Sequence, residues 1–168
     1  MSTTPAPHGA MVRKETLGNL VATMVIAALL CWLIFRGETR IPAFAPPPGG
    51  IFGILPGTFN FTLLVTVALT LITRRRMRAG LYRRLEPGEG PNFGAKLPQR
   101  LMLRAVALAL VATLLFVPVG AVGTWLAIQL GVVAAEWTFL GMTLFFIGYF
   151  ALLAWVVTPV VLWRALRD

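Results

Sequence analysis

Four long apolar segments, separated by polar stretches, dominate the pattern along the chain. They cover residues of about 17–35, 51–73, 102–133 and 137–163. A helix needs roughly 20 apolar residues to cross a hydrocarbon layer about 30 Å thick, so each segment is a candidate span. We therefore predict an all-α integral membrane protein with four transmembrane helices, in which residues 1–168 form a single membrane domain.

Polar connections rich in proline and glycine separate the spans. Residues 36–50 and residues 74–100 carry most of these turn-forming residues, which do not sustain a helix. The residues before position 17 are predicted to form a flexible tail that leads into the first helix. A cleaved signal peptide is the alternative for this region, but the first apolar run is longer than a usual signal-peptide core, so we expect it to be retained.

Three prolines lie inside the predicted spans and mark expected bends. Pro56, next to Gly57, is expected to bend or interrupt the second helix near its start. Pro118 and Pro159 are expected to kink the third and fourth helices, because an internal proline removes a helical hydrogen bond.

Composition agrees with a membrane location. Of the 168 residues, 58% are hydrophobic and 12% are charged, whereas about a quarter are charged in typical soluble domains. The net charge of +9 must therefore be placed relative to a membrane before it can indicate a partner.

The basic residues are distributed unequally between the two sides of the predicted spans. Only Arg36 and Arg40 fall on one side. The other side holds the residues of a basic run, Arg74, Arg75, Arg76, Arg78, Arg83 and Arg84, together with Arg13, Lys14, Lys96, Arg100, Arg104, Arg164 and Arg167. Because basic loops stay in the cytoplasm, we predict a cytoplasmic loop at 74–100, an extracytoplasmic loop at 36–50 and two cytoplasmic termini. The arginine- and alanine-rich composition favours a bacterial inner membrane.

The two halves of the chain resemble each other at an offset of about 90 residues. Residues 20–23, Leu-Val-Ala-Thr, recur at 110–113, and the basic residues after the second span match those after the fourth. We predict two tandem helical hairpins in parallel orientation, related by an axis along the membrane normal.

The sequence has few residues of the types that catalyse reactions. The ionisable residues Glu15, Arg104 and Glu136 fall at segment ends, and we expect Arg104 to extend toward the membrane surface. The chain has one histidine, and its one serine is Ser2. We therefore expect no enzyme activity, no catalytic or metal site and no cofactor.

A few polar residues inside the spans form a candidate intramembrane site. They are Asn60, Gln129, Thr58 and Thr62. Two interpretations stay open: these side chains bond neighbouring helices, or they surround a small polar cavity near the irregular Pro56–Gly57 segment.

Small residues at helical spacing mark candidate helix contacts. They are Gly53, Gly57, Gly123, Ala127, Gly131, Gly141 and Gly148. The spacing does not distinguish contacts within one molecule from contacts between copies.

The basic run at 74–84 orients the chain and has a second possible role. Arginines near the surface attract anionic lipid headgroups, and neutralising Arg83 and Arg84 tests that role; an acidic protein partner is another possibility. Nucleic acid is not expected, because no binding module accompanies the charges. We predict a non-enzymatic accessory or scaffold subunit that packs against another membrane protein or itself. The alternative is a small oligomeric permease or channel for a neutral or lipophilic solute.

Overall fold

A computed structural model of the chain describes residues 8–44, 50, 53–86 and 97–168, and these residues form long helices. The helices are α1 (His8–Phe35), α2 (Ile54–Arg78), α3 (Leu101–Gln129) and α4 (Phe139–Ala165), joined at one end by the short strands β1 (Ile41–Pro42) and β2 (Glu136–Trp137). All four helices are long and apolar enough to cross a membrane. The predicted all-α architecture with four candidate spans is confirmed.

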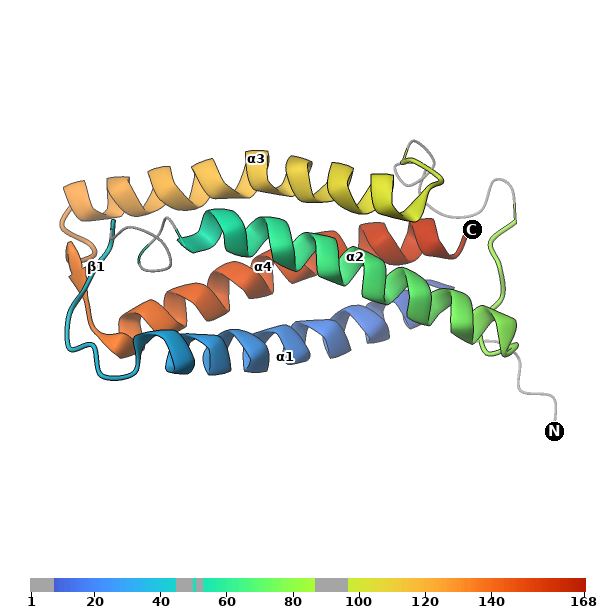
Figure 1. The fold of residues 1–168 in the computed structure, drawn as a ribbon, viewed down its shortest axis with the longest axis horizontal. Helices are drawn as coiled ribbons and strands as arrows, with labels where there is room; N and C mark the ends of the chain where they lie inside the picture. The colour runs from blue at the N-terminus through green and yellow to red at the C-terminus, as the bar shows by residue number, and fades with distance from the viewer. Residues whose placement is uncertain (1–7, 45–49, 51–52, 87–96) are drawn as a thin grey trace.

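The helices lie along a common direction, with α2 and α4 between α3 and α1 (Figure 1). The largest contacts join α1 to α4 and α2 to α3, α2 also packs on α4, and α3 touches α4 only slightly. The helices of each predicted hairpin are therefore not each other's main packing partners. The three main contacts are nevertheless exchanged among themselves when α1 is swapped with α3 and α2 with α4, whereas the slight α3–α4 contact has no α1–α2 counterpart of the same size among the described residues. The packing is thus compatible with a two-fold repeat, which stays a prediction.

Helix α1 begins earlier than the sequence pattern indicates. Residues from His8 onward are helical, although the region before position 17 was expected to be a flexible tail. Val12 is buried in an apolar cluster that also holds Leu162, from the last turns of α4, and Glu15 pairs with Arg76. Tertiary contacts therefore stabilise a helical start that lacks the uniform hydrophobicity of a span.

Glycine caps set the ends of α2 and α3. Gly131 has φ +69°, its N–H donates to the Ile128 carbonyl, and the next N–H, of Val132, donates to the Ala127 carbonyl. This pair of bonds is a Schellman cap, which ends α3 before the predicted limit at 133. Gly80, with φ +71°, ends α2 in the same way, after the helix has continued past the predicted end of the membrane span at 73.

The prolines interrupt the helices less than expected. Pro56 lies in the first turn of α2, where its missing N–H would have no helical acceptor, so the predicted interruption there is wrong. The predicted start of this span at position 51 lies outside the described residues. Helices α3 and α4 continue through Pro118 and Pro159, so any bend at these positions leaves each helix unbroken.

Only some of the predicted packing glycines lie at close helix contacts. A Cβ added to Gly57 would lie 2.8 Å from Phe150 Cζ of α4, which places Gly57 at the α2–α4 crossing. Gly120, which the spacing argument did not select as a packing residue, approaches Ile54 and Tyr149 similarly. The other predicted packing residues do not lie at close helix contacts. Gly53 and Gly131 cap α2 and α3, and Ala127 is half-buried. A Cβ added to Gly141 would lie at ordinary contact distance, and one added to Gly123 or Gly148 would have no neighbour within 4 Å.

A leucine at Gly57 is expected to destabilise the bundle. The Gly57→Leu side chain would overlap the Phe150 ring, and overpacking of this kind costs typically about 1–3 kcal/mol. The matched variant Gly18→Leu adds the same side chain on an exposed face of α1 and should cost less than about 1 kcal/mol. Thermal unfolding of both purified variants in detergent compares them. Equal losses of stability would contradict the assigned helix crossing.

Candidate functional site

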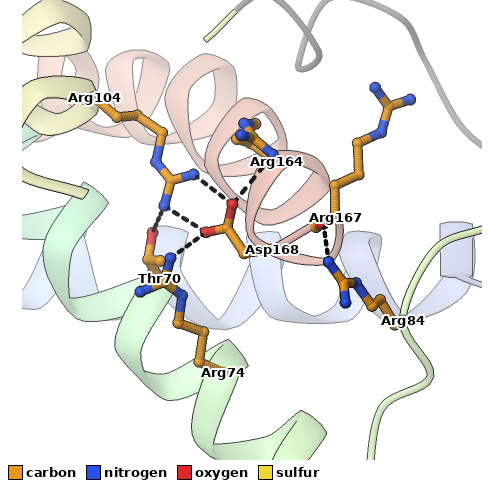
Figure 2. A network of polar contacts seen from close by, with 7 residues as sticks. All are labelled: Thr70, Arg74, Arg84, Arg104, Arg164, Arg167 and Asp168. Carbon is orange, nitrogen blue, oxygen red and sulfur yellow. Dashed lines mark hydrogen bonds and ion pairs between the residues drawn. The ribbon is translucent and has the colours of Figure 1, made fainter. Parts of the chain in front are cut away.

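A buried ionic cluster lies where α2, α3 and α4 come together, at the end of the bundle where α1 begins and α4 ends (Figures 1 and 2). We call it the Asp168 cluster; its members are Thr70, Arg74, Arg104, Arg164 and Asp168. Figure 2 shows three arginine side chains directed at one carboxylate from three different helices.

Arg104 makes the most complete contact with the carboxylate. Its two terminal nitrogens donate to the two oxygens of Asp168 at 3.1 and 2.9 Å, and Nη2 also donates to Thr70 Oγ1 at 3.3 Å. Arg74 lies 2.8 Å from Oδ2 of the same aspartate, and Arg164 lies 3.1 Å from Oδ1. A two-pronged contact of this kind suits the planar guanidinium group and fixes its orientation.

The positive charge of the cluster exceeds its negative charge. Three guanidinium groups face one carboxylate, and Arg104 has no exposed side-chain surface. Burial alone would raise the pKa of the Asp168 carboxyl, but hydrogen bonds and charge from Arg104, with help from Arg74 and Arg164, outweigh burial and hold the pKa below its ordinary value. Within the described residues, the Nε atoms of Arg104 and Arg164 are buried without a hydrogen-bond partner.

A row of buried threonines runs along α2 from the other end of the bundle to this cluster. Its members are Thr58, Thr62, Thr66 and Thr70, spaced four residues apart and without exposed surface. Thr58 shares a 2.7 Å hydrogen bond with Tyr149 of α4, and Thr66 donates to the backbone of its own helix. The row therefore follows the face of α2 that packs inside the bundle.

The predicted polar site does not come together as one unit. Thr58 and Thr62 are buried, whereas Asn60, between them in sequence, is exposed on another face of α2. Gln129 is exposed at the end of α3. The structure thus separates the two amide side chains from the threonines.

A second polar group fixes the segment that follows α2. The Tyr82 hydroxyl donates to Glu15 of α1 at 2.7 Å and accepts from Arg76 at 2.6 Å. Burial, followed by the hydrogen bond to Glu15, raises the pKa of Tyr82 above its ordinary value. This group connects α1 to the chain just beyond α2.

The arginines of the basic run have different surroundings. Arg74 belongs to the Asp168 cluster, Arg76 binds Glu15 and Tyr82, and Arg83 forms an exposed ion pair with Glu86. Arg84 donates to the Arg167 carbonyl, and Arg75 and Arg78 are exposed.

Sequence reasoning missed the centre of the cluster. Asp168 was not selected, and Arg104 was expected to reach toward the membrane surface, whereas its side chain is fully buried. One local signal was available, because Arg164 and Asp168 are four residues apart and so can meet across one turn.

We compared the chain with known protein families, with curated proteins and with solved structures. None of them matches it.

Proposed function

We propose that this chain is a non-enzymatic integral membrane protein that serves as an accessory or scaffold subunit, packing against another membrane protein or a second copy of itself. The proposal rests on the outer surface of the bundle, where large apolar side chains and the glycines Gly123 and Gly148 are exposed. We further propose that the arginine-rich end, with both termini, lies in the cytoplasm of a bacterium and that the four helices cross its inner membrane as a tandem repeat.

The exposed apolar surface supports insertion into lipid. Leu114 and Val119 on α3 and Leu64 on α2 are 72%, 70% and 65% exposed, and similar residues occur on all four helices. A soluble monomer rarely leaves such continuous apolar surface in water. Lipid chains solvate this surface without the cost that water imposes.

The interior of the bundle supports a packing role over a transport or catalytic one. The α2 threonines have no exposed surface, so their hydroxyls are closed off by neighbouring side chains. The buried arginines and Asp168 bind each other. In contrast, Gly123 and Gly148 have no atom within contact range of an added Cβ, which leaves room for a partner helix to approach.

The position of Asn60 favours the second candidate function, an oligomeric permease or channel. Its amide is exposed on α2 and forms no hydrogen bond with any described residue. A polar side chain facing lipid is unfavourable, so this face suits contact with a second copy or another polar surface. Copies assembled around Asn60 would place a polar group at their shared boundary.

Affinity purification in mild detergent, with cross-linking before extraction, tests the proposed role. We expect the wild-type protein to carry a second membrane protein or a second copy in fixed proportion. Asn60→Leu should leave thermal stability within about 0.5 kcal/mol, because no internal contact is lost, but should reduce the amount of partner recovered. Asn19→Leu is a contrasting variant, since Asn19 donates to Thr158 inside the bundle and its loss should lower stability.

The outcomes separate the two candidates. A lone monomer with no cross-linked partner would contradict the accessory role. Solute flux in proteoliposomes that is present in wild type and lost in Asn60→Leu would instead support the permease.

A further inference from the structure

A hollow of about 450 Å³ opens beside the Asp168 cluster at the charged end of the bundle. Its walls come from the last turns of α2, the segment after α2 and the C-terminal end of the chain. They are formed by Arg74, Met77, Arg78, Tyr82, Arg84 and Asp168. Figure 2 shows the side chains of three of these residues, Arg74, Arg84 and Asp168.

The walls of the hollow are held in place by contacts behind them. Tyr82 is fixed by Glu15 and Arg76, as described above. Leu85 is buried, and its N–H donates to the Leu166 carbonyl at 3.0 Å, which ties the segment after α2 to the end of α4. Arg84 donates to the neighbouring Arg167 carbonyl at 3.1 Å. Arg74, bound to Asp168, and Arg84 are therefore positioned before any ligand arrives, which lowers the ordering cost of binding.

The hollow has a strong excess of positive charge. Arg74, Arg78 and Arg84 line it, and Arg104 and Arg164 lie behind Asp168. The three arginines and one carboxylate of the wall give it a net charge of +2, and that carboxylate already binds Arg74, Arg104 and Arg164. Arg78 has no hydrogen bond or ion pair with any residue that the structure describes. An anion in the hollow would thus meet donors that no internal acceptor satisfies.

We propose that this hollow binds a phosphate group, carried by a membrane lipid headgroup or free in solution. Guanidinium groups donate parallel hydrogen bonds that match phosphate oxygens. Met77 and the Tyr82 ring supply apolar wall beside these donors, which suits the glycerol and upper acyl region of a lipid. The lipid source rests on the proposed membrane insertion, because the hollow then lies at the depth where headgroups begin.

Arg83 and Arg84, neighbours in the basic run, have different surroundings in the structure. Arg83 was expected to act with Arg84 on headgroups, but Arg83 pairs with Glu86 and does not line the hollow. Arg78, rather than Arg83, lines the hollow together with Arg84. The binding variant is therefore Arg78→Gln with Arg84→Gln.

Binding to the full-length protein in uncharged detergent tests the proposal. The probes are short-chain phosphatidic acid, short-chain phosphatidylcholine and inorganic phosphate, each titrated by calorimetry. The control is Arg75→Gln with Arg100→Gln, which removes the same charge from exposed arginines at the same end that do not line the hollow. We expect the binding variant to weaken phosphatidic acid binding about tenfold or more and the control by less than about threefold.

Each outcome bears on the proposal. If the binding variant weakens the binding of phosphatidic acid and phosphate does not bind, the hollow is a headgroup site. If phosphate alone binds and the binding variant weakens it, the hollow is a site for a free anion. Equal losses in both double variants, or no binding to wild type, would overturn it. Arg78→Gln alone, which removes no internal contact, guards against misfolding and should still weaken binding measurably. Extraction of the same variants from membranes reports separately on membrane insertion.

Discussion

Asp168→Asn is expected to lower the free energy of unfolding by about 3 kcal/mol, because it leaves buried guanidinium groups without their counter-charge. Arg104 is fully buried, and both of its terminal nitrogens donate to Asp168. Water cannot replace the carboxylate easily at such a site, so the repulsion between Arg104 and Arg164 would no longer be offset.

Thermal unfolding of the purified protein in detergent measures this effect. Glu86→Gln is the matched control, because it removes one carboxylate from the exposed pair with Arg83, where a change of less than about 1 kcal/mol is expected. Combining Asp168→Asn with Arg104→Met should recover part of the loss, since the fully buried charge is removed with its partner. An Asp168→Asn protein as stable as the Glu86→Gln protein would contradict the cluster.

The lowered pKa of Asp168 adds a pH signature to the same prediction. A carboxyl whose folded pKa is depressed stabilises the protein above its unfolded pKa of about 3.9 and loses this contribution as pH falls through the folded pKa. The difference in stability between wild type and Asp168→Asn should therefore be constant near neutral pH and shrink below about pH 4.

The four helices could be predicted from sequence because each carries a continuous apolar run. Their ends were less accessible. The start of α1 depends on contacts of Val12 and Glu15 with residues far along the chain, and the end of α3 depends on a left-handed conformation at Gly131. The pairing of α1 with α4 also reflects long-range packing that hydropathy does not encode.

The candidate site was harder to predict than the helices. Arg104 looks like an ordinary boundary residue until α2 and α4 bring Thr70 and Asp168 against it. Asn60 is the most polar residue of its segment but points away from the threonine row, because two residues along a helix place side chains on different faces. These residues can be read from the sequence, but the packing of three helices that brings them together cannot.

The arginine-rich end of the bundle is expected to face the cytoplasm. Basic residues near span ends resist translocation, and the end that carries the Asp168 cluster holds nearly all of them. At the opposite end, where β1 pairs with β2, the basic residues that the structure describes are Arg36 and Arg40. Membrane orientation is the largest effect that this charge distribution should have, and it precedes any binding role of the hollow.

Labelling of single cysteines in intact cells measures this orientation most directly. In a Cys31→Ala background, Thr39→Cys places an exposed thiol near the β1–β2 end, and Ala79→Cys places one at the arginine-rich end. A membrane-impermeant thiol reagent is predicted to label position 39 in intact spheroplasts and position 79 only after the membrane is opened. Labelling of position 79 in intact spheroplasts, or of both positions equally before lysis, would contradict a four-span protein with its arginine-rich end in the cytoplasm.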